Sequence, residues 1–271
     1  MSEPAPVRTA PPVRPEVRSA ISHASQATGV DFSYLLGQAR IESGLNPDAR
    51  ARTSSAAGLY QFTQGTWLAT LDRHGAEHGY GWAGDAIEGG RVKDPAMRRQ
   101  ILALRYDPQA AALMAGELAG DNREALIGVL GREPDAAELY LAHFLGAGGA
   151  SRFLTALSSD PEQSAAALFP DAAAANRAIF YGADGAPRSL GAVMDLLRGK
   201  MDRAMGGDGF DPQLAAIPAQ AWSGQLGAAP TDPVSPRPSM ADTLASTFGG
   251  NAPGAPAHVR AAYGKLRAFG L

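Results

Sequence analysis

The residue whose type and spacing best suit acid–base chemistry is Glu42, in the segment VDFSYLLGQARIESGLNP, residues 30–47. Asp31 can accept the unpaired N–H groups of a first helical turn, and Gly44 can end the helix. Glu42 follows Leu35 by seven residues, which is nearly two full turns, so its side chain projects from the apolar face. A carboxylate on that face needs an explanation.

Two physical effects favour a protonated carboxyl group at this position. Burial disfavours the charged form, and the negative end of the helix dipole lies in the last turn. A protonated acid is what cleavage of a glycosidic bond requires, because the leaving oxygen is too basic to depart unprotonated. The alternative is a structural carboxylate that pairs with Arg40 or Arg50, and on the spacing alone this alternative is the stronger one.

A second segment, SSAAGLYQFTQGTWL, residues 54–68, could form a sugar-binding loop before a helix capped by Thr63. Gln61 can offer a donor and an acceptor to the acetamido or hydroxyl groups of a sugar, and Tyr60 can supply a ring face. The alternative is that Tyr60 and Phe62 belong to the core and that Gln61 caps a helix.

A third segment, ELYLAHFLGAGGA, residues 138–150, places Tyr140 on a helical face with Ala137 and Phe144, before a glycine-rich loop. Tyr140 is therefore either a core residue or a residue whose hydroxyl reaches the pocket of the acid.

Together the three segments resemble the soluble lytic transglycosylase (SLT) family, whose relatives include goose-type lysozyme. The family pattern is Glu-Ser at a helix end, then Gly-Leu-Met-Gln, then Ala-Tyr-Asn. The matching elements here are Glu42-Ser43, Gly58-Leu59-Tyr60-Gln61 and Leu139-Tyr140-Leu141. Tyr60 replaces the Met, and Leu141 replaces the Asn, so a polar substrate contact is either missing or supplied by His143.

The resemblance implies an all-α, lysozyme-like domain that acts on peptidoglycan without a cofactor. It implies that Glu42 is the acid and then the base, that Ser43 orients Glu42 or the muramyl group, and that Gln61 and Tyr140 line the cleft. In this chemistry the acid protonates the β-1,4 oxygen between N-acetylmuramic acid and N-acetylglucosamine. The muramyl C6 hydroxyl then closes a 1,6-anhydro ring, so no second carboxylate is needed, unlike in the usual glycosidases.

Several other residues are candidates for substrate contact. Glu117 lies on an apolar helical face. It is either a residue of the substrate cleft or a structural acid whose hydrogen bonds are satisfied within the protein. A true hydrolase, a muramidase, would need a second acid such as Glu117 or Asp85. Tyr80 and Trp82 lie in a glycine-rich loop and could stack on a sugar ring.

A histidine pair is the only metal-like pattern that the sequence offers. His74 and His78 have the i, i+4 spacing of a helical metal pair, yet Gly75 and Gly79 weaken the helix and no clear third ligand follows. We therefore expect no metal.

Composition excludes several classes of protein. The 271 residues, 45% of them hydrophobic, suffice for one substantial core. A net charge of -3 makes nucleic acid a poor partner, and the absence of cysteine excludes disulfides and thiolate catalysis. No membrane span or signal segment is evident, so a location in the bacterial cell envelope or periplasm would require an export route that the sequence does not reveal.

Apolar residues at helical spacing predict the catalytic domain over residues 16–205, after a disordered arm at 1–15. A flexible Pro/Gly-rich linker at 206–254 and a short amphipathic helix at 255–271 should follow. That last helix could dock on its own domain or bind a protein partner, and a non-catalytic glycan-binding or scaffold module of an envelope-spanning machine is the remaining alternative. The predicted helices are 15–28, 31–43, 63–73, 94–104, 108–119, 122–131, 134–145, 151–158, 161–168, 171–180 and 189–204.

Overall fold

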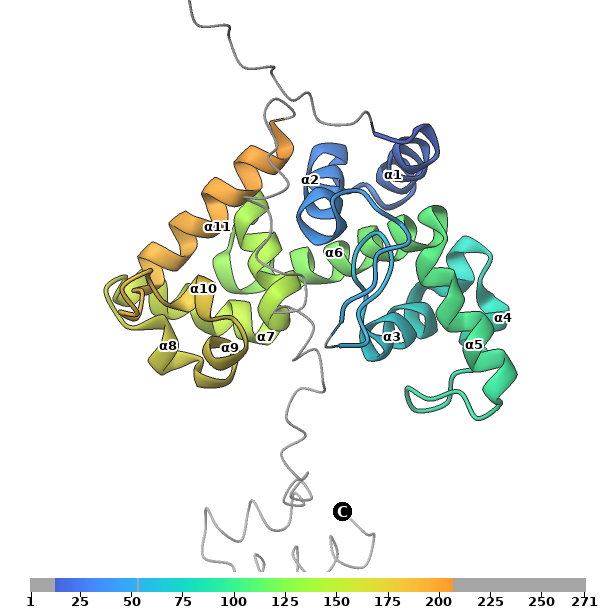
Figure 1. The fold of residues 1–271 in the computed structure, drawn as a ribbon. Coiled ribbons are helices and arrows are strands. Elements are labelled where there is room, and N and C mark those ends of the chain that lie inside the picture. Colours follow the sequence, from blue (N-terminus) through green and yellow to red (C-terminus); the bar gives the residue numbers. More distant parts are fainter. Residues whose placement is uncertain (1–12, 53, 207–271) are drawn as a thin grey trace, which may run out of the picture. The chain divides into compact units, whose positions relative to one another are not determined.

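The computed structural model describes residues 13–52 and 54–206, and this part of the chain is helical (Figure 1). Five isolated bridges occur there, but no strand, so the prediction of an all-α domain is confirmed for these residues. The α-helices are α1 (Pro15–Thr28), α2 (Phe32–Ser43), α3 (Gln64–His74), α4 (Gly81–Gly84), α5 (Pro95–Ala103), α6 (Pro108–Leu130), α7 (Ala136–Ser159), α8 (Ala165–Leu168), α9 (Pro170–Ala175), α10 (Arg177–Phe180) and α11 (Leu190–Met205). Two 3-10 helices, η1 (Gly75–His78) and η2 (Leu104–Tyr106), follow α3 and α5.

The long helix α6 runs through the middle of the fold and packs against α1 and α7 (Figure 1). Every residue from Ala110 to Gly116 is buried, because a helix that is apolar all round can only be stable inside a core. Gly116 lets α1 approach closely, since a Cβ there would lie 2.5 Å from Oγ1 of Thr28. On the other side of the core, α11 packs against α2 and α7.

Side-chain caps fix where most of the long helices begin. Asp31 accepts a hydrogen bond of 2.9 Å from the backbone N–H of Tyr34 at the start of α2. Asp94 and Asp107 cap α5 and α6 and are each followed by a proline in the first turn, as the Asp-Pro pairs predict.

The third Asp-Pro pair does not start a helix, so the prediction of a helix over 161–168 is wrong at its beginning. Asp160 instead accepts a hydrogen bond from the backbone N–H of Glu162 and forms a turn. Ser164 then caps α8, which begins four residues later than predicted. The same local hydrogen-bonding capacity that lets Asp cap a helix also lets it close a turn.

Other differences between the predicted and the observed helices lie at glycine and asparagine residues. The predicted helices 108–119 and 122–131 are one helix, α6, because Gly120 costs only about 1 kcal/mol inside a helix that packing holds in place. Helices 134–145 and 151–158 join into α7 across a kink at Gly146, whose φ is 72°. The predicted helix 171–180 divides into α9 and α10 at Asn176, and η1 and α4 were not predicted.

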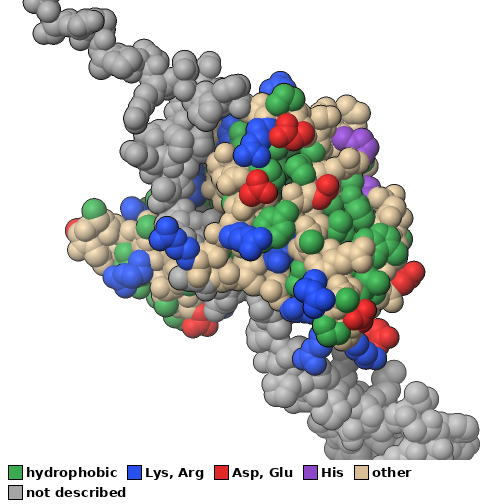
Figure 2. Space-filling view, turned by 45° about the vertical axis from the view of Figure 1, so that its right-hand side comes forward, with side chains coloured by type: hydrophobic (Ala, Val, Ile, Leu, Met, Phe, Trp, Pro, Cys, Tyr) green, Lys and Arg blue, Asp and Glu red, His purple; other side chains and the backbone are tan. Residues whose placement is uncertain are grey.

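Some predictions fall outside the described residues: most of the arm at 1–15, nearly all of the linker at 206–254, and the amphipathic helix at 255–271. Within the described part, no helix is long and apolar enough to span a membrane. Figure 2 shows one face of the molecule, on which Lys and Arg side chains lie among acidic and apolar ones.

Candidate active site

Glu42 lies in the last turn of α2, and its side chain is only 2% exposed. The hydroxyl of Tyr140 donates a hydrogen bond of 3.1 Å to Oε1 of Glu42. Nε2 of His143 lies 3.5 Å from the same oxygen, and its ring stacks on that of Tyr140. Two side chains from the first half of α7 therefore converge on a single buried carboxylate at the end of α2.

The two arginines that could have made Glu42 a simple ion-pair partner are engaged elsewhere. Nη1 of Arg40 donates to the backbone carbonyl of Ala204 at 2.5 Å, which joins α2 to the end of α11. The guanidinium of Arg50 lies over the ring of Tyr106, 4.8 Å from its centroid. Within residues 13–52 and 54–206, neither Arg40 nor Arg50 pairs with Glu42, and the burial of Glu42 calls for a different explanation.

Ser43 ties the end of α2 to the loop that carries the second motif. Its hydroxyl donates to the backbone carbonyl of Leu59 at 2.7 Å and accepts from the backbone N–H of Asn46 at 3.1 Å. This contact fixes Leu59 relative to Glu42, the neighbour of Ser43. Of the two roles that the resemblance implies for Ser43, the geometry fits the orientation of Glu42.

Gln61 uses its side chain to close the same loop. Its Nε2 donates to the backbone carbonyls of Gly58 at 2.9 Å and Ala49 at 3.2 Å, and its φ is 48°, in the left-handed region. The protons of the amide are thus directed at the protein rather than outward. Gln61 shapes the backbone next to the acid, which differs from the expectation that it presents its donors to a sugar.

Tyr60 lies entirely within the core, with 0% of its surface exposed. Its ring therefore offers no face to a sugar in this structure, and of the two interpretations of Tyr60 the core one matches the geometry. Leu141, at the position of the family's Asn, is also completely buried. A polar contact near Glu42 comes instead from His143.

Arg105 holds the loop in place from the other side. Its Nη1 donates to the carbonyls of Ser55 at 2.6 Å and Phe62 at 3.1 Å, and Nε donates to Leu102 at 3.0 Å. Burial lowers the pKa of Arg105 from its ordinary value. The loop is thus pinned by one buried guanidinium, which sequence reasoning did not single out.

Two further residues near Glu42 were missed from the sequence. Tyr34, earlier on α2, is buried, and burial together with the negative charge of Glu42 raises its pKa. Lys200, on α11, is 7% exposed, and its Nζ lies 6.0 Å from the ring centroid of Tyr140. Burial lowers the pKa of Lys200 to about 8, while the charge of Glu42 acts in the opposite direction. The acid therefore shares its buried surroundings with an amine.

Because Lys200 is buried, we expect the free energy of unfolding to rise with pH. The pKa of Lys200 is about 8 in the folded protein and 10.5 ordinarily, so between these values the unfolded chain binds the additional proton. The free energy of unfolding should therefore increase by about 2 kcal/mol from pH 8 to pH 10 relative to a Lys200→Met variant. Urea denaturation of both proteins at several pH values measures this difference, and a difference that stays flat over that range would contradict it.

The hydroxyl of Tyr140 remains a hydrogen-bond donor to Glu42. Burial, followed by the charge of Glu42 and the hydrogen bond between them, raises the pKa of Tyr140 well above 10. The hydroxyl therefore keeps its proton and donates a hydrogen bond to Oε1 of Glu42. The carboxyl group of Glu42 is thus held through Oε1 by a donor that does not lose its proton.

The remaining candidates lie on other elements. Glu117, on α6, contacts His78 at 2.6 Å and His74 at 3.4 Å, which matches a satisfied structural acid. Trp82 is 39% exposed in α4, which packs mainly against α3 and η1. Its exposure agrees with the expectation for this loop, while a contact with substrate stays a prediction.

A scan against models of known protein families found no match for this chain.

Proposed function

We propose that this protein is a peptidoglycan lytic transglycosylase, in which Glu42 is the general acid and then the general base. The observation that carries the proposal is that three distant segments meet at the end of α2, where Glu42 and Ser43 lie. Ser43 bonds to Leu59 across 16 residues, and Tyr140 bonds to Glu42 across 98 residues. These are the same three segments whose residues resemble the SLT family, and the resemblance implies that they line one cleft.

The proposed first step is protonation of the glycosidic oxygen by Glu42. The bond from C1 of N-acetylmuramic acid to that oxygen breaks, with help from the neighbouring acetamido group, and N-acetylglucosamine leaves with the proton of Glu42. Burial supports this role, because a carboxyl group removed from water transfers its proton to a bound oxygen rather than to solvent. Tyr140 supports it by holding Oε1 in one place.

In the proposed second step the carboxylate of Glu42 takes the proton of the muramyl C6 hydroxyl. That oxygen attacks C1, displaces the acetamido oxygen from it and closes the 1,6-anhydro ring, so the acid is regenerated and no water is added. The substrate supplies its own nucleophile, which suits a site where one carboxylate is surrounded by Tyr140, His143 and Tyr34. A lysozyme-like fold and a location in the bacterial cell envelope are parts of this proposal.

The muramidase alternative gains no support from the geometry of its second acids. Glu117 is engaged by two histidines, and Asp85 is an exposed residue at the end of α4. A hydrolase would need one of them to activate water beside Glu42. The contacts of Glu117 are instead with His74 and His78, and neither histidine contacts Glu42 in the described part.

Release of soluble muropeptides from purified sacculi tests the proposal. We expect the untagged protein to release them, and we expect the rate to scale with protein concentration. Co-sedimentation with sacculi without release would support the glycan-binding or scaffold alternative and would overturn the enzymatic one. A role for the C-terminal tail in binding a protein partner concerns residues outside the described part.

Removal of the Tyr140 hydroxyl should slow the reaction without unfolding the protein. Tyr140→Phe keeps the buried ring but frees Oε1 of Glu42, so we expect the rate of muropeptide release to fall roughly 10- to 100-fold. Tyr181→Phe, on a residue outside the site, is the matched control and should retain the wild-type rate. Equal rates for wild type and Tyr140→Phe would show that this bond does not position the acid.

A further inference from the structure

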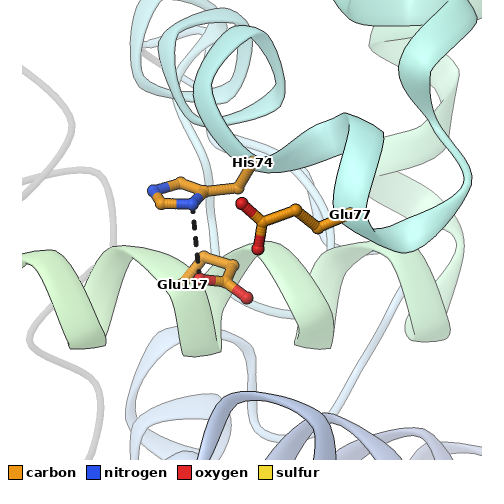
Figure 3. Close-up of side chains that lie close together, drawn as sticks. All are labelled: His74, Glu77 and Glu117. Carbon is orange, nitrogen blue, oxygen red and sulfur yellow. Dashed lines mark ion pairs between the residues drawn. The ribbon is translucent and has the colours of Figure 1, made fainter.

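We infer that His74, Glu77 and Glu117 form a binding site for a divalent transition-metal ion such as Zn²⁺, separate from the Glu42 site. One nitrogen of His74 and one oxygen of each glutamate all lie within 4.8 Å of one another. In Figure 3 the three side chains point toward a common space, His74 from the end of α3, Glu77 from η1 and Glu117 from α6. The sequence offered a pair of histidines without a third ligand, and the fold supplies carboxylates from two elements.

The nitrogen and oxygen donors suit a divalent ion of intermediate hardness, such as Zn²⁺. One imidazole nitrogen and two carboxylate oxygens are the ligands that Zn²⁺ takes at about 2.0–2.2 Å, whereas Ca²⁺ prefers oxygen alone. Nδ1 of His74 and Oε2 of Glu117 already lie 3.4 Å apart, a separation that two ligands of one such ion can have. Glu77 is exposed and can rotate inward without disturbing the core. Three protein ligands leave a fourth position to water.

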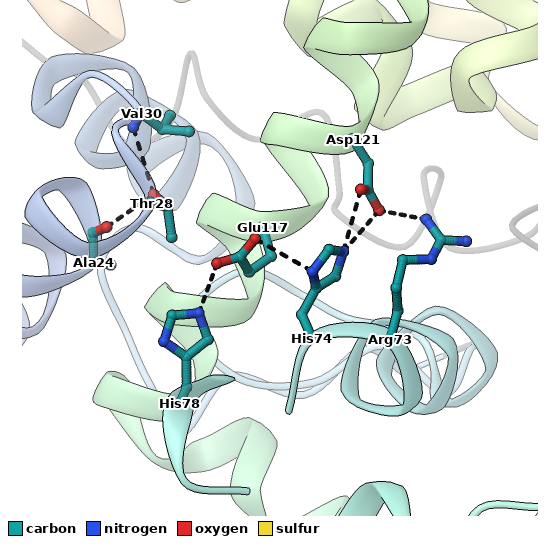
Figure 4. Close-up of polar contacts among 8 residues, drawn as sticks. All are labelled: Ala24, Thr28, Val30, Arg73, His74, His78, Glu117 and Asp121. Atoms are coloured by element: carbon teal, nitrogen blue, oxygen red, sulfur yellow. Dashed lines mark hydrogen bonds and ion pairs between the residues drawn. The ribbon is translucent and has the colours of Figure 1, made fainter. Parts of the chain in front are cut away.

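Asp121 and His78 orient two of the three ligands (Figure 4). Nε2 of His74 lies 3.1 Å from Oδ2 of Asp121, one helical turn after Glu117 on α6. Nε2 of His78 lies 2.6 Å from Oε1 of Glu117, which leaves Oε2 directed at His74. A carboxylate behind a ligating histidine, and a hydrogen bond to a ligating carboxylate, are the supports that protein metal sites use.

Both ring nitrogens of His74 lie against carboxylates. Nε2 lies 3.1 Å from Oδ2 of Asp121, and Nδ1 lies 3.4 Å from Oε2 of Glu117. The contact between Nδ1 and Oε2 is favourable when a proton or a cation lies between the two atoms, and a bound metal ion would take the place of the proton.

The charged side chains around the proposed site also favour a bound cation. Three carboxylates, Glu77, Glu117 and Asp121, gather here with one guanidinium, that of Arg73, which pairs with Asp121. Among the described residues the three carboxylates outnumber this guanidinium, and a divalent ion would add positive charge beside them. The bound ion would join α3 and η1 to the central helix α6, so its expected effect is on the stability of that contact.

Isothermal titration of the untagged, full-length protein with ZnCl₂ tests the site. We expect about one equivalent of Zn²⁺ to bind with a dissociation constant in the micromolar range or below. At a hundredfold excess over that constant, Tm should rise by on the order of 5 °C. Co²⁺ in place of Zn²⁺ should show the visible absorption of a site with nitrogen and oxygen ligands.

Single substitutions separate the proposed ligands from other residues. Glu77→Gln alters an exposed side chain and should fold normally, yet weaken Zn²⁺ binding at least tenfold, and His74→Ala should abolish it. His23→Ala, at an exposed histidine of α1, is the control and should bind as the wild type does. Glu42→Gln should also bind normally, so the outcome is independent of the proposed enzymatic activity. No binding by the wild type, or binding that survives both Glu77→Gln and His74→Ala, would overturn the inference.

Discussion

Glu42→Gln should reduce the release of muropeptides from sacculi by at least about 1,000-fold. The amide can neither donate an acidic proton to the glycosidic oxygen nor take one from the C6 hydroxyl, so both proposed steps fail. Its Oε1 can still accept the hydrogen bond of Tyr140, and an uncharged group is easier to bury than a carboxylate. The variant should therefore be folded, at least as stable as the wild type, and able to bind sacculi.

Glu124→Gln provides the control for this result. Glu124 is an exposed residue of α6, so the same chemical change there should leave the rate of release unaltered. Initial rates from purified sacculi, together with urea denaturation of each variant, separate loss of catalysis from loss of folding. Substantial release by folded Glu42→Gln would remove Glu42 from the mechanism.

Gly58→Ala should destabilise the protein by more than about 3 kcal/mol. Gly58 has φ of 80°, which costs a residue with a Cβ about 1–2 kcal/mol, and the new atom would lie 1.7 Å from the backbone carbonyl oxygen of Arg105. The loop or η2 must shift to relieve this clash, which disturbs the contacts that Arg105 and Gln61 make. Urea denaturation measures the change.

Gly120→Ala is the matched control for this prediction. Gly120 lies within α6, and a Cβ there would meet nothing within 4 Å, so alanine should stabilise the helix by up to about 1 kcal/mol. Because Ser43 bonds to Leu59 next to Gly58, Gly58→Ala should also lower the rate of muropeptide release in the fraction that remains folded. A small loss of stability, similar to that of an exposed alanine substitution, would show that the loop is not held as the structure has it.

Helix boundaries were predictable where the signal is local. The Asp94 and Asp107 caps act within one turn, so sequence alone places the starts of α5 and α6. At Asp160 the same residue type closes a turn instead, and the backbone N–H of Ala165, at the start of α8, donates to the distant carbonyl of Arg188, a contact that no local pattern reveals. Merged helices such as α6 likewise reflect packing that outweighs the propensity of a single glycine.

The buried position of Glu42 was predictable from its distance of two helical turns to Leu35. For Tyr140 the two interpretations proved compatible: the ring is buried and the hydroxyl reaches the acid. Lys200 had a detectable signal that was overlooked, since it lies three residues after Leu197 and four before Ala204, within the apolar stripe of α11.

Other parts of the arrangement depend on contacts between distant segments. Arg105 binds carbonyls of the loop 43 and 50 residues away, and nothing in the sequence around it indicates these partners. Glu117 meets His78 across 39 residues in the same way, so its contacts with the two histidines could not be found by spacing. Tertiary packing alone brings these groups together.

Mass spectrometry of the muropeptides released from purified sacculi tests the central claim most directly, namely that this protein cleaves the glycan strand without adding water. We predict that the wild type releases glycans whose muramyl ends are lighter by one water, as 1,6-anhydro rings, and that Glu42→Gln releases none. Ordinary reducing ends would contradict the lytic transglycosylase mechanism and indicate a hydrolase, and the absence of any release by the folded wild-type protein would contradict the enzymatic function itself.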